Sequence, residues 1–91
     1  MSKIALITGA TSGIGAACAQ LFAEQGYNLI LLGRREQLLA DKGKILEEKY
    51  GIDVKRVVAD VRDNEDISYR LDTLPAHWKK VDVLINNAGL S

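Results

Sequence analysis

A glycine-rich segment with two hydroxyl side chains follows the first apolar run of this 91-residue chain. In the stretch ITGATSGIG, Thr11 and Ser12 lie between Gly9 and Gly13, and Gly15 follows two residues later. Where such a turn opens a helix, free backbone N–H groups and the positive end of the helix dipole attract anions. The spacing predicts a pyrophosphate site: the first glycine permits the turn, the second admits the phosphates, and the third lets the helix pack close to the sheet. The two hydroxyl groups are candidate hydrogen-bond donors.

A glycine-rich turn without any ligand is the alternative interpretation, because glycine motifs taken alone have low specificity. A P-loop is excluded, since no Lys-Ser or Lys-Thr pair follows the glycines. The apolar run before the turn and the helical pattern after it favour the nucleotide site over the empty turn.

Two consecutive arginines, Arg34 and Arg35, follow the second apolar run. A site for NAD usually has an acidic residue here, which accepts a hydrogen bond from the ribose 2′-hydroxyl. Guanidinium groups suit a phosphate instead. Cations at the start of a helix oppose its dipole, and this segment lacks a capping residue, so a bound phosphate would relieve both defects. The pair predicts NADP over NAD; the alternative is two solvated arginines, one of which Glu36 could neutralise.

The apolar pattern places both motifs at the ends of alternating strands and helices. Strands are predicted at residues 3–8, 28–33, 54–59 and 81–85, and helices at residues 13–25 and 36–50. A third, short helix is capped by Asp63 or Asn64 and ended by Pro75. This βαβαβαβ order predicts an α/β fold, a Rossmann-type doubly wound parallel sheet with strand order 3-2-1-4. The fourth strand is then an apolar edge, which normally has a partner.

Apolar residues recur at helical spacing in both longer helices. They are Ile14, Cys18, Leu21 and Phe22 in the first and Leu38, Leu39, Ile45 and Leu46 in the second. Gly26 and Gly51 follow the two helices where a left-handed residue commonly ends a helix. Both segments are therefore expected to pack one apolar side against the sheet.

Three motifs at strand ends together resemble the short-chain dehydrogenase/reductase family. TGATSGIG, residues 8–15, resembles the TGxxxGxG cofactor motif of that family, and NNAG, residues 86–89, resembles its NNAG motif. Asp60-Val61 resembles the pair that contacts the adenine ring. The match runs over essentially the whole chain. It implies that residues 1–91 are the N-terminal, cofactor-binding part of a single Rossmann domain.

The resemblance also implies roles for individual residues. Ser12, Gly13 and Ile14 would contact the pyrophosphate and ribose, and Asp60 would accept from the adenine amino group beside the Val61 backbone. Asn87, Ala88 and Gly89, after the fourth strand, would line the ribose region of the cofactor. Asn86 would instead tie neighbouring strands together through its amide. The predicted cofactor-binding residues are Gly9, Thr11, Ser12, Gly13, Ile14, Gly15, Arg34, Arg35, Asp60, Val61, Asn87, Ala88 and Gly89.

Catalysis in the family uses a tyrosine as general acid/base, a lysine four residues later and a serine. Neither Tyr27, Tyr50 nor Tyr69 has a lysine four residues later, so no catalytic residue is predicted within the chain. The resemblance implies an NADP-dependent oxidoreductase that transfers hydride between NADP(H) and an alcohol or carbonyl substrate. Its catalytic part would lie outside these residues, and this chain would be inactive alone.

The segment LDTLPAHWKKVDVLINNAGLS further resembles a bacterial subgroup of NADP-dependent 3-hydroxy-acid dehydrogenases acting on serine and related acids. The family also implies a homo-oligomer.

Composition excludes several other classes of protein. Lysine and arginine balance aspartate and glutamate at 12 each, which argues against a nucleic-acid partner. No apolar run reaches the length of a membrane span, the N-terminus does not resemble a signal peptide, and one cysteine is consistent with a reducing compartment. We therefore expect a cytoplasmic protein without a metal site. Two alternatives remain open: a non-catalytic nucleotide-binding or regulatory module, and a fragment that only assembles with other chains.

Overall fold

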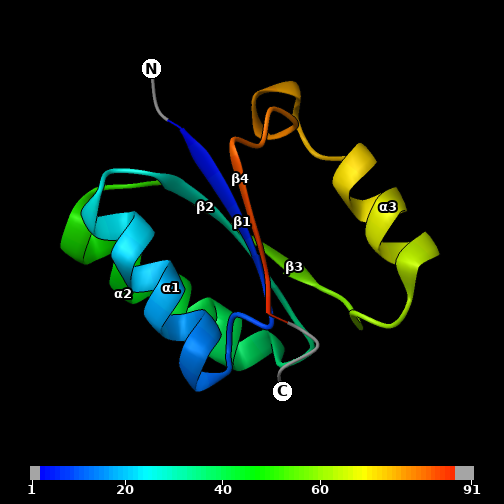
Figure 1. The fold of residues 1–91 in the computed structure, drawn as a ribbon, viewed down its shortest axis with the longest axis horizontal. Coiled ribbons are helices and arrows are strands. Elements are labelled where there is room, and N and C mark those ends of the chain that lie inside the picture. Colours follow the sequence, from blue (N-terminus) through cyan, green and yellow to red (C-terminus); the bar gives the residue numbers. More distant parts are fainter. Residues whose placement is uncertain (1–2, 88–91) are drawn as a thin grey trace.

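The computed structural model describes residues 3–87, which form a four-stranded parallel sheet with helices on both faces (Figure 1). The strands are β1 (Ile4–Thr8), β2 (Asn28–Gly33), β3 (Val54–Val58) and β4 (Val83–Asn86). The helices are α1 (Gly13–Glu24), α2 (Glu36–Tyr50), α3 (Asn64–Asp72) and a short 3-10 helix, η1 (Ala76–Trp78). The order across the sheet is β3-β2-β1-β4 and every pair is parallel, so the predicted fold and strand order are confirmed.

The fourth strand is displaced from its predicted bounds. It begins at Val83 and extends through Asn86, which pairs with Thr8 at the end of β1. Asp82 lies just before β4 and makes two hydrogen bonds to Ile4 at the start of β1. Its backbone N–H donates to the Ile4 carbonyl at 2.9 Å, and its carboxylate accepts from the Ile4 N–H at 2.9 Å. The carboxylate thus takes the place of a further strand residue, and regular pairing starts after it.

Each face of the sheet has its own apolar core. The face under α1 and α2 is built around buried strand residues Ala5, Ile7, Leu29, Leu31 and Val54. The face under α3 and η1 is built around Ile4, Leu6, Ile30, Leu32 and Val57, with Trp78 buried against them. β1 and β2 are therefore covered on both sides, as all-parallel sheets require. This burial makes the strand ends a rigid base for the loops that follow them.

Small residues form the fully buried side of α1, and of the predicted stripe only Cys18 and Phe22 pack against the core. Gly15, Ala19 and Ala23 face the sheet, while Ile14 and Leu21 are 58% and 60% exposed. The four-residue spacing of small side chains lets the helix backbone approach the sheet closely. A pattern that counts only large apolar residues therefore misses the small residues at the centre of the buried face.

α2 matches the prediction at Leu39 and Leu46, which are buried, and departs from it at Leu38 and Ile45. Leu39, Gly43 and Leu46 are its buried residues, and Ile45 is 60% exposed. A Cβ on Gly43 would lie 2.8 Å from the guanidinium of Arg56. Arg56 on β3 reaches across to Glu47 at 3.0 Å and to the Ala40 carbonyl at 3.4 Å. The missing side chain thus makes room for a polar contact between α2 and β3.

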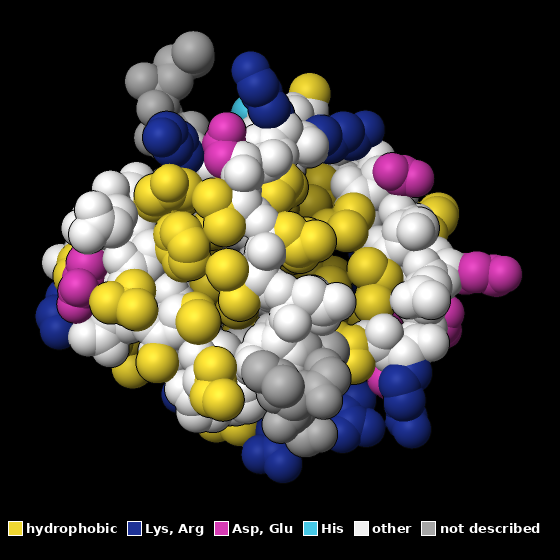
Figure 2. Space-filling model, viewed as in Figure 1, with side chains coloured by type: hydrophobic (Ala, Val, Ile, Leu, Met, Phe, Trp, Pro, Cys, Tyr) yellow, Lys and Arg dark blue, Asp and Glu magenta, His cyan; other side chains and the backbone are white. Residues whose placement is uncertain are grey.

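β4 has a paired side and an open side. It pairs with β1, and among residues 3–87 no other strand pairs with it. Leu84 on this strand is 59% exposed, and Figure 2 shows hydrophobic side chains gathered along β4. Within the same described residues, no helix is long and apolar enough to cross a membrane.

Candidate functional site

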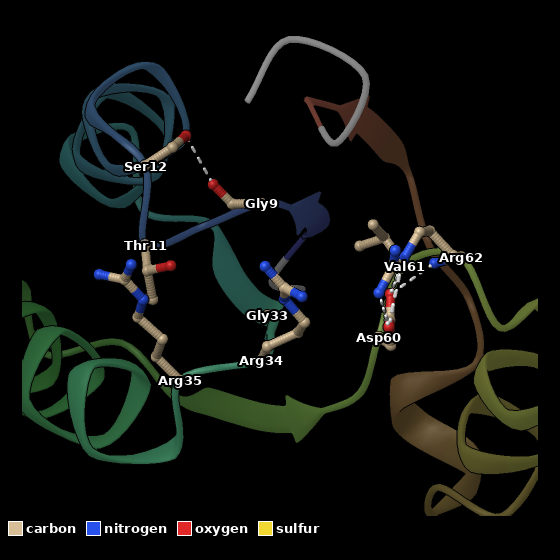
Figure 3. Close-up of a pocket in the computed structure, with 9 residues that line it drawn as sticks. All are labelled: Gly9, Thr11, Ser12, Gly33, Arg34, Arg35, Asp60, Val61 and Arg62. Carbon is tan, nitrogen blue, oxygen red and sulfur yellow. Dashed lines mark hydrogen bonds and ion pairs between the residues drawn. The ribbon is translucent and has the colours of Figure 1, made fainter.

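A pocket of about 400 Å³ lies at the carboxyl ends of β1, β2 and β3 (Figure 3). It is lined by Gly9, Thr11, Ser12, Gly33, Arg34, Arg35, Asp60, Val61 and Arg62. Ligands of doubly wound sheets bind outside the carboxyl ends of the strands, next to the point where the strand order reverses. Here that point is β1, with β2 on one side and β4 on the other. The pocket thus combines the glycine turn, both arginines and the Asp-Val pair.

The glycine turn is closed by its own hydrogen bonds. Gly9 has a φ of +62°, which side-chain-bearing residues rarely adopt. The Ser12 hydroxyl donates to the Gly9 carbonyl at 2.8 Å and accepts from the Gly15 N–H at 3.2 Å, which caps α1. The hydroxyl hydrogen of Ser12 is therefore used inside the turn. Helix geometry leaves the N–H groups of Gly13 and Ile14 without intrahelical acceptors, so these are the groups that can meet an anion.

Gly15 is the point at which the turn, α1 and the end of β4 meet. A Cβ on Gly15 would overlap the carbonyl oxygen of Gly9 and lie 2.9 Å from the side-chain nitrogen of Asn87. We predicted that this glycine lets the helix approach the sheet. The structure shows a tighter requirement, because the helix contacts the turn backbone and a buried amide. By contrast, a Cβ on Gly13 would meet nothing within 4 Å.

Asn87 is buried behind the turn, at 3% exposure. Its Nδ2 donates to the Ser12 hydroxyl at 2.6 Å and to the Gly9 carbonyl at 3.3 Å. The Asn87 amide thus supports the turn from behind. Ala88 and Gly89, which were predicted with it, lie outside the described residues. Asn86 ties β4 to β1, as expected, by accepting from the Thr8 hydroxyl at 3.0 Å.

Arg34 and Arg35 are exposed and extend from the end of β2 toward the glycine turn (Figure 3). Arg35 occupies the N-cap position of α2 and makes no capping hydrogen bond with its side chain, as predicted. The ion pairs found among residues 3–87 include neither arginine, so Glu36 does not neutralise them. Two positive charges and an uncapped helix start therefore lie at one side of the pocket.

Asp60 is paired with an arginine that sequence reasoning missed. Arg62 binds the Asp60 carboxylate at 2.9 Å through Nη2. The hydrogen bonds from Arg62, with a smaller contribution from the charge of Arg34, lower the pKa of Asp60 to about 2. Arg62 lies in a turn that is closed by a hydrogen bond of 2.9 Å from the Asp63 N–H to the Asp60 carbonyl. An arginine two residues after an aspartate, followed by a helix cap, was the available signal.

The structure brings some predicted site residues together and separates others. Gly9, Thr11, Ser12, Arg34, Arg35, Asp60 and Val61 line one pocket. Gly13, Ile14 and Gly15 stand beside it at the start of α1, whereas Asn87 lies behind the glycine turn and does not line the pocket. No group of three or more His, Cys, Asp or Glu among the described residues could hold a metal ion. The arrangement suits an elongated anionic ligand that carries phosphates at two positions.

The short chain dehydrogenase family model matches residues 3–91. Sulfoacetaldehyde reductase 2 of Chromohalobacter salexigens is 46% identical over 91 residues, which is 100% of this chain and 35% of that protein. NADP-dependent 3-hydroxy acid dehydrogenase YdfG of Salmonella typhi is 41% identical over 88 residues, 97% of this chain and 34% of that protein. The chain thus spans about a third of the length of these relatives.

Solved structures give the same result. L-Sorbose reductase from Gluconobacter frateurii, complexed with NADPH and L-sorbose, superposes with a TM-score of 0.88 at 36% identity, covering 97% of this chain and 34% of that one. An alcohol dehydrogenase from the archaeon Thermococcus sibiricus, complexed with 5-hydroxy-NADP, superposes with a TM-score of 0.85 at 32% identity, covering 92% and 36%. With the family model matching nearly every residue, the chain belongs to the short chain dehydrogenase family.

Proposed function

We propose that this chain binds NADP in the pocket at the strand ends, as the cofactor-binding part of an oxidoreductase. The observation that supports this proposal most strongly is the placement of Arg34 and Arg35. Both line the pocket that holds the glycine turn, and among residues 3–87 neither is in an ion pair. Free guanidinium groups beside an anion-binding turn favour a cofactor with an additional phosphate on its ribose.

The residues present fit such a group. A ribose phosphate carries nearly two negative charges near neutral pH, and the two guanidinium groups supply the matching positive charges. The uncapped start of α2 adds its dipole and free N–H groups. The N–H groups of Gly13 and Ile14, with Thr11 beside them, face the pyrophosphate at the start of α1. Asp60 and Val61 hold the adenine, Ala88 and Gly89 would line the second ribose, and Asn87 acts through the turn that it supports.

The bound cofactor supplies the hydride donor or acceptor, and the residues of this chain bind and orient it. The proposed reaction interconverts an alcohol and a carbonyl compound, and residues outside 1–91 carry the acid/base chemistry. The names of the two relatives support small substrates that bear an acid group, since they specify sulfoacetaldehyde and 3-hydroxy acids. We therefore propose a 3-hydroxy acid, or the related carbonyl acid, as the substrate class.

The open side of β4 supports a larger domain and an assembly. Leu84 is 59% exposed on an edge strand, and such edges are normally covered. We propose that residues 1–91 are the N-terminal part of one Rossmann domain, whose sheet continues beyond β4, and that the intact protein is a cytoplasmic homo-oligomer. The chain covers about a third of the length of its relatives, which supports its assignment as part of a larger domain.

Titration of the intact protein with NADPH and NADH tests the cofactor assignment. We expect NADPH to bind at least about tenfold more tightly, because each charge-assisted contact to the phosphate contributes about 1.5–3 kcal/mol. Replacing both Arg34 and Arg35 by glutamine should remove this preference. The matched control replaces Lys79 and Lys80, two consecutive exposed cations outside the pocket, and should retain it. Equal affinity for both cofactors in the wild type would contradict the proposal.

A further inference from the structure

The Asp60–Arg62 pair forms one wall of the pocket, with Arg35 at the opposite side and Arg34 between them (Figure 3). The backbone N–H and Nε of Arg62 donate to Oδ1 of Asp60 at 2.9 and 3.1 Å. Nη2 donates to Oδ2 at 2.9 Å, with Nε at 3.3 Å from the same oxygen. The half-buried side chain of Val61 packs against the apolar core under α3. Arg62 thus holds the Asp60 carboxylate from one side, and Val61 anchors the adjacent backbone to the core.

The hydrogen bonds determine what Asp60 can still accept. An ionised carboxylate has about four lone-pair sites, two on each oxygen. Two good donors of Arg62 occupy Oδ1, and one good donor occupies Oδ2. The longer contact from Nε to Oδ2 shares a hydrogen already given to Oδ1. One acceptor site on Oδ2 therefore remains for a ligand, in an orientation that the guanidinium fixes.

Arg62 also neutralises the charge of Asp60. Arg34, one of the proposed phosphate ligands, is near enough to Asp60 to lower the pKa of its carboxyl. A carboxylate without its partner would therefore repel a phosphate held by Arg34. The pair as a whole is neutral, so Asp60 can accept a hydrogen bond from a base without opposing the phosphate beside it.

We propose, on the basis of the nucleotide pocket described under Proposed function, that Arg62 is a positioning residue for base selection. It holds Asp60 so that a single acceptor site faces the exocyclic amine of an adenine-type base. A base with a carbonyl in that place would set oxygen against oxygen and leave both acceptors without a donor. Sites built to bond a ligand N–H discriminate against analogues that lack it. Arg62 therefore governs the choice of base, whereas Arg34 and Arg35 govern the ribose phosphate.

The test measures the affinity of the intact protein for NADPH and for its hypoxanthine analogue, in which a carbonyl replaces the amine. The wild type should prefer NADPH by about tenfold, the value of one net hydrogen bond with its desolvation. Arg62→Met should reduce this preference to about twofold or less, since the Asp60 carboxylate can then turn away from the base and bond water. The NADPH to NADH ratio should fall by a smaller factor, because the unpaired Asp60 carboxylate then repels the ribose phosphate.

Two further variants separate orientation from charge and from general stability. Arg62→Lys keeps the charge but cannot form the fork, so it should lose the base preference while binding NADPH more tightly than Arg62→Met. Arg70→Met removes a similar pair on α3, where Arg70 Nε lies 2.9 Å from Asp66 Oδ2, and should keep the wild-type preference. In the Asp60→Asn background, Arg62→Met should change nothing more, because Arg62 acts through that carboxylate.

Either an unchanged base preference in Arg62→Met or a further loss in the Asp60→Asn background overturns the inference. In both cases NADPH still binds, so the proposed function stands. A wild type that does not bind NADPH overturns the proposed function and the inference together. The titration of the wild type thus distinguishes the two kinds of failure.

Discussion

The starts of α1 and α2 open onto the same pocket but are built in opposite ways. At α1, Ser12 caps the helix and Asn87 supports the turn from behind, so the turn is ordered by internal hydrogen bonds. At α2, the N-cap residue Arg35 makes no side-chain capping bond, and Arg34 adds a second cation. The first site is prepared before any ligand arrives. The second is electrostatically unfavourable until an anion binds, which is typical of a recognition site that gives up some stability.

The largest effect should follow from filling the space at Gly15. Gly15→Ala places a Cβ into the Gly9 carbonyl and the Asn87 amide, and overpacking of this kind costs about 1–3 kcal/mol. Urea denaturation of the intact protein would show a lower midpoint. Gly13→Ala is the matched control, because a Cβ there meets nothing within 4 Å. It should leave stability unchanged or slightly higher, and equal losses in the two variants would contradict the close-approach argument.

A smaller loss is expected when the cap of α1 is removed. Ser12→Ala deletes the acceptor for the Gly15 N–H and for the Asn87 amide. Loss of a serine cap costs about 1 kcal/mol, in a range of roughly 0.5–2. The same denaturation experiment measures it, with Thr11→Ala, the neighbouring half-buried hydroxyl, as the control that should stay near the wild-type value. No loss in Ser12→Ala would show that the turn does not depend on this network.

The start of α2 should respond with the opposite sign. Arg35→Ser removes a cation from a helix N-terminus and introduces a capping side chain, so we expect a gain of about 0.5–1 kcal/mol without cofactor. NADPH affinity should fall in the same variant. Thermal unfolding with and without NADPH measures both quantities. A variant that is less stable in the absence of cofactor would remove the contrast between the two helix starts.

The smallest effect concerns the titration of Asp60. Arg62 lowers the pKa of Asp60 from 3.8 to about 2, so Arg62→Met should raise it back toward 3.8. Because the folded-state pKa is depressed, the pair adds stability above about pH 4, and that stability is lost as the pH falls toward 2. The variant should therefore lose less stability than the wild type over this interval. The ¹³C chemical shift of the Asp60 carboxyl, followed against pH, measures the pKa directly, and an unshifted value would mean that the pair does not persist in solution.

Local patterns predict the fold well, because each strand is an apolar run and each longer helix is followed by a glycine or a proline that stops it. Parallel strands with right-handed crossovers then leave few possible sheet orders. The same patterns misplace Ile14 and Leu21, since close approach to the sheet selects small residues, which carry little weight in an apolar pattern. Leu38 and Ile45 are exposed because the adjacent Leu39 and Leu46 take the buried positions of α2, with Gly43 between them.

Contacts between distant segments are harder to predict. The Asn87 side chain supports a turn more than seventy residues earlier in the chain, and no local spacing indicates that pairing. The Asp60–Arg62 pair depends on a turn whose side-chain geometry is set by the following helix cap. Arg34 and Arg35, in contrast, could be recognised from chemistry alone, because two cations without a cap oppose a helix start.

A structure of the intact protein with bound NADP would locate the 2′-phosphate relative to the two arginines. We expect the 2′-phosphate within hydrogen-bonding distance of Arg34 or Arg35, and the pyrophosphate at the N–H groups of Gly13 and Ile14. A 2′-phosphate that points into solvent, or that is held by other cations while these arginines remain free, would contradict this expectation.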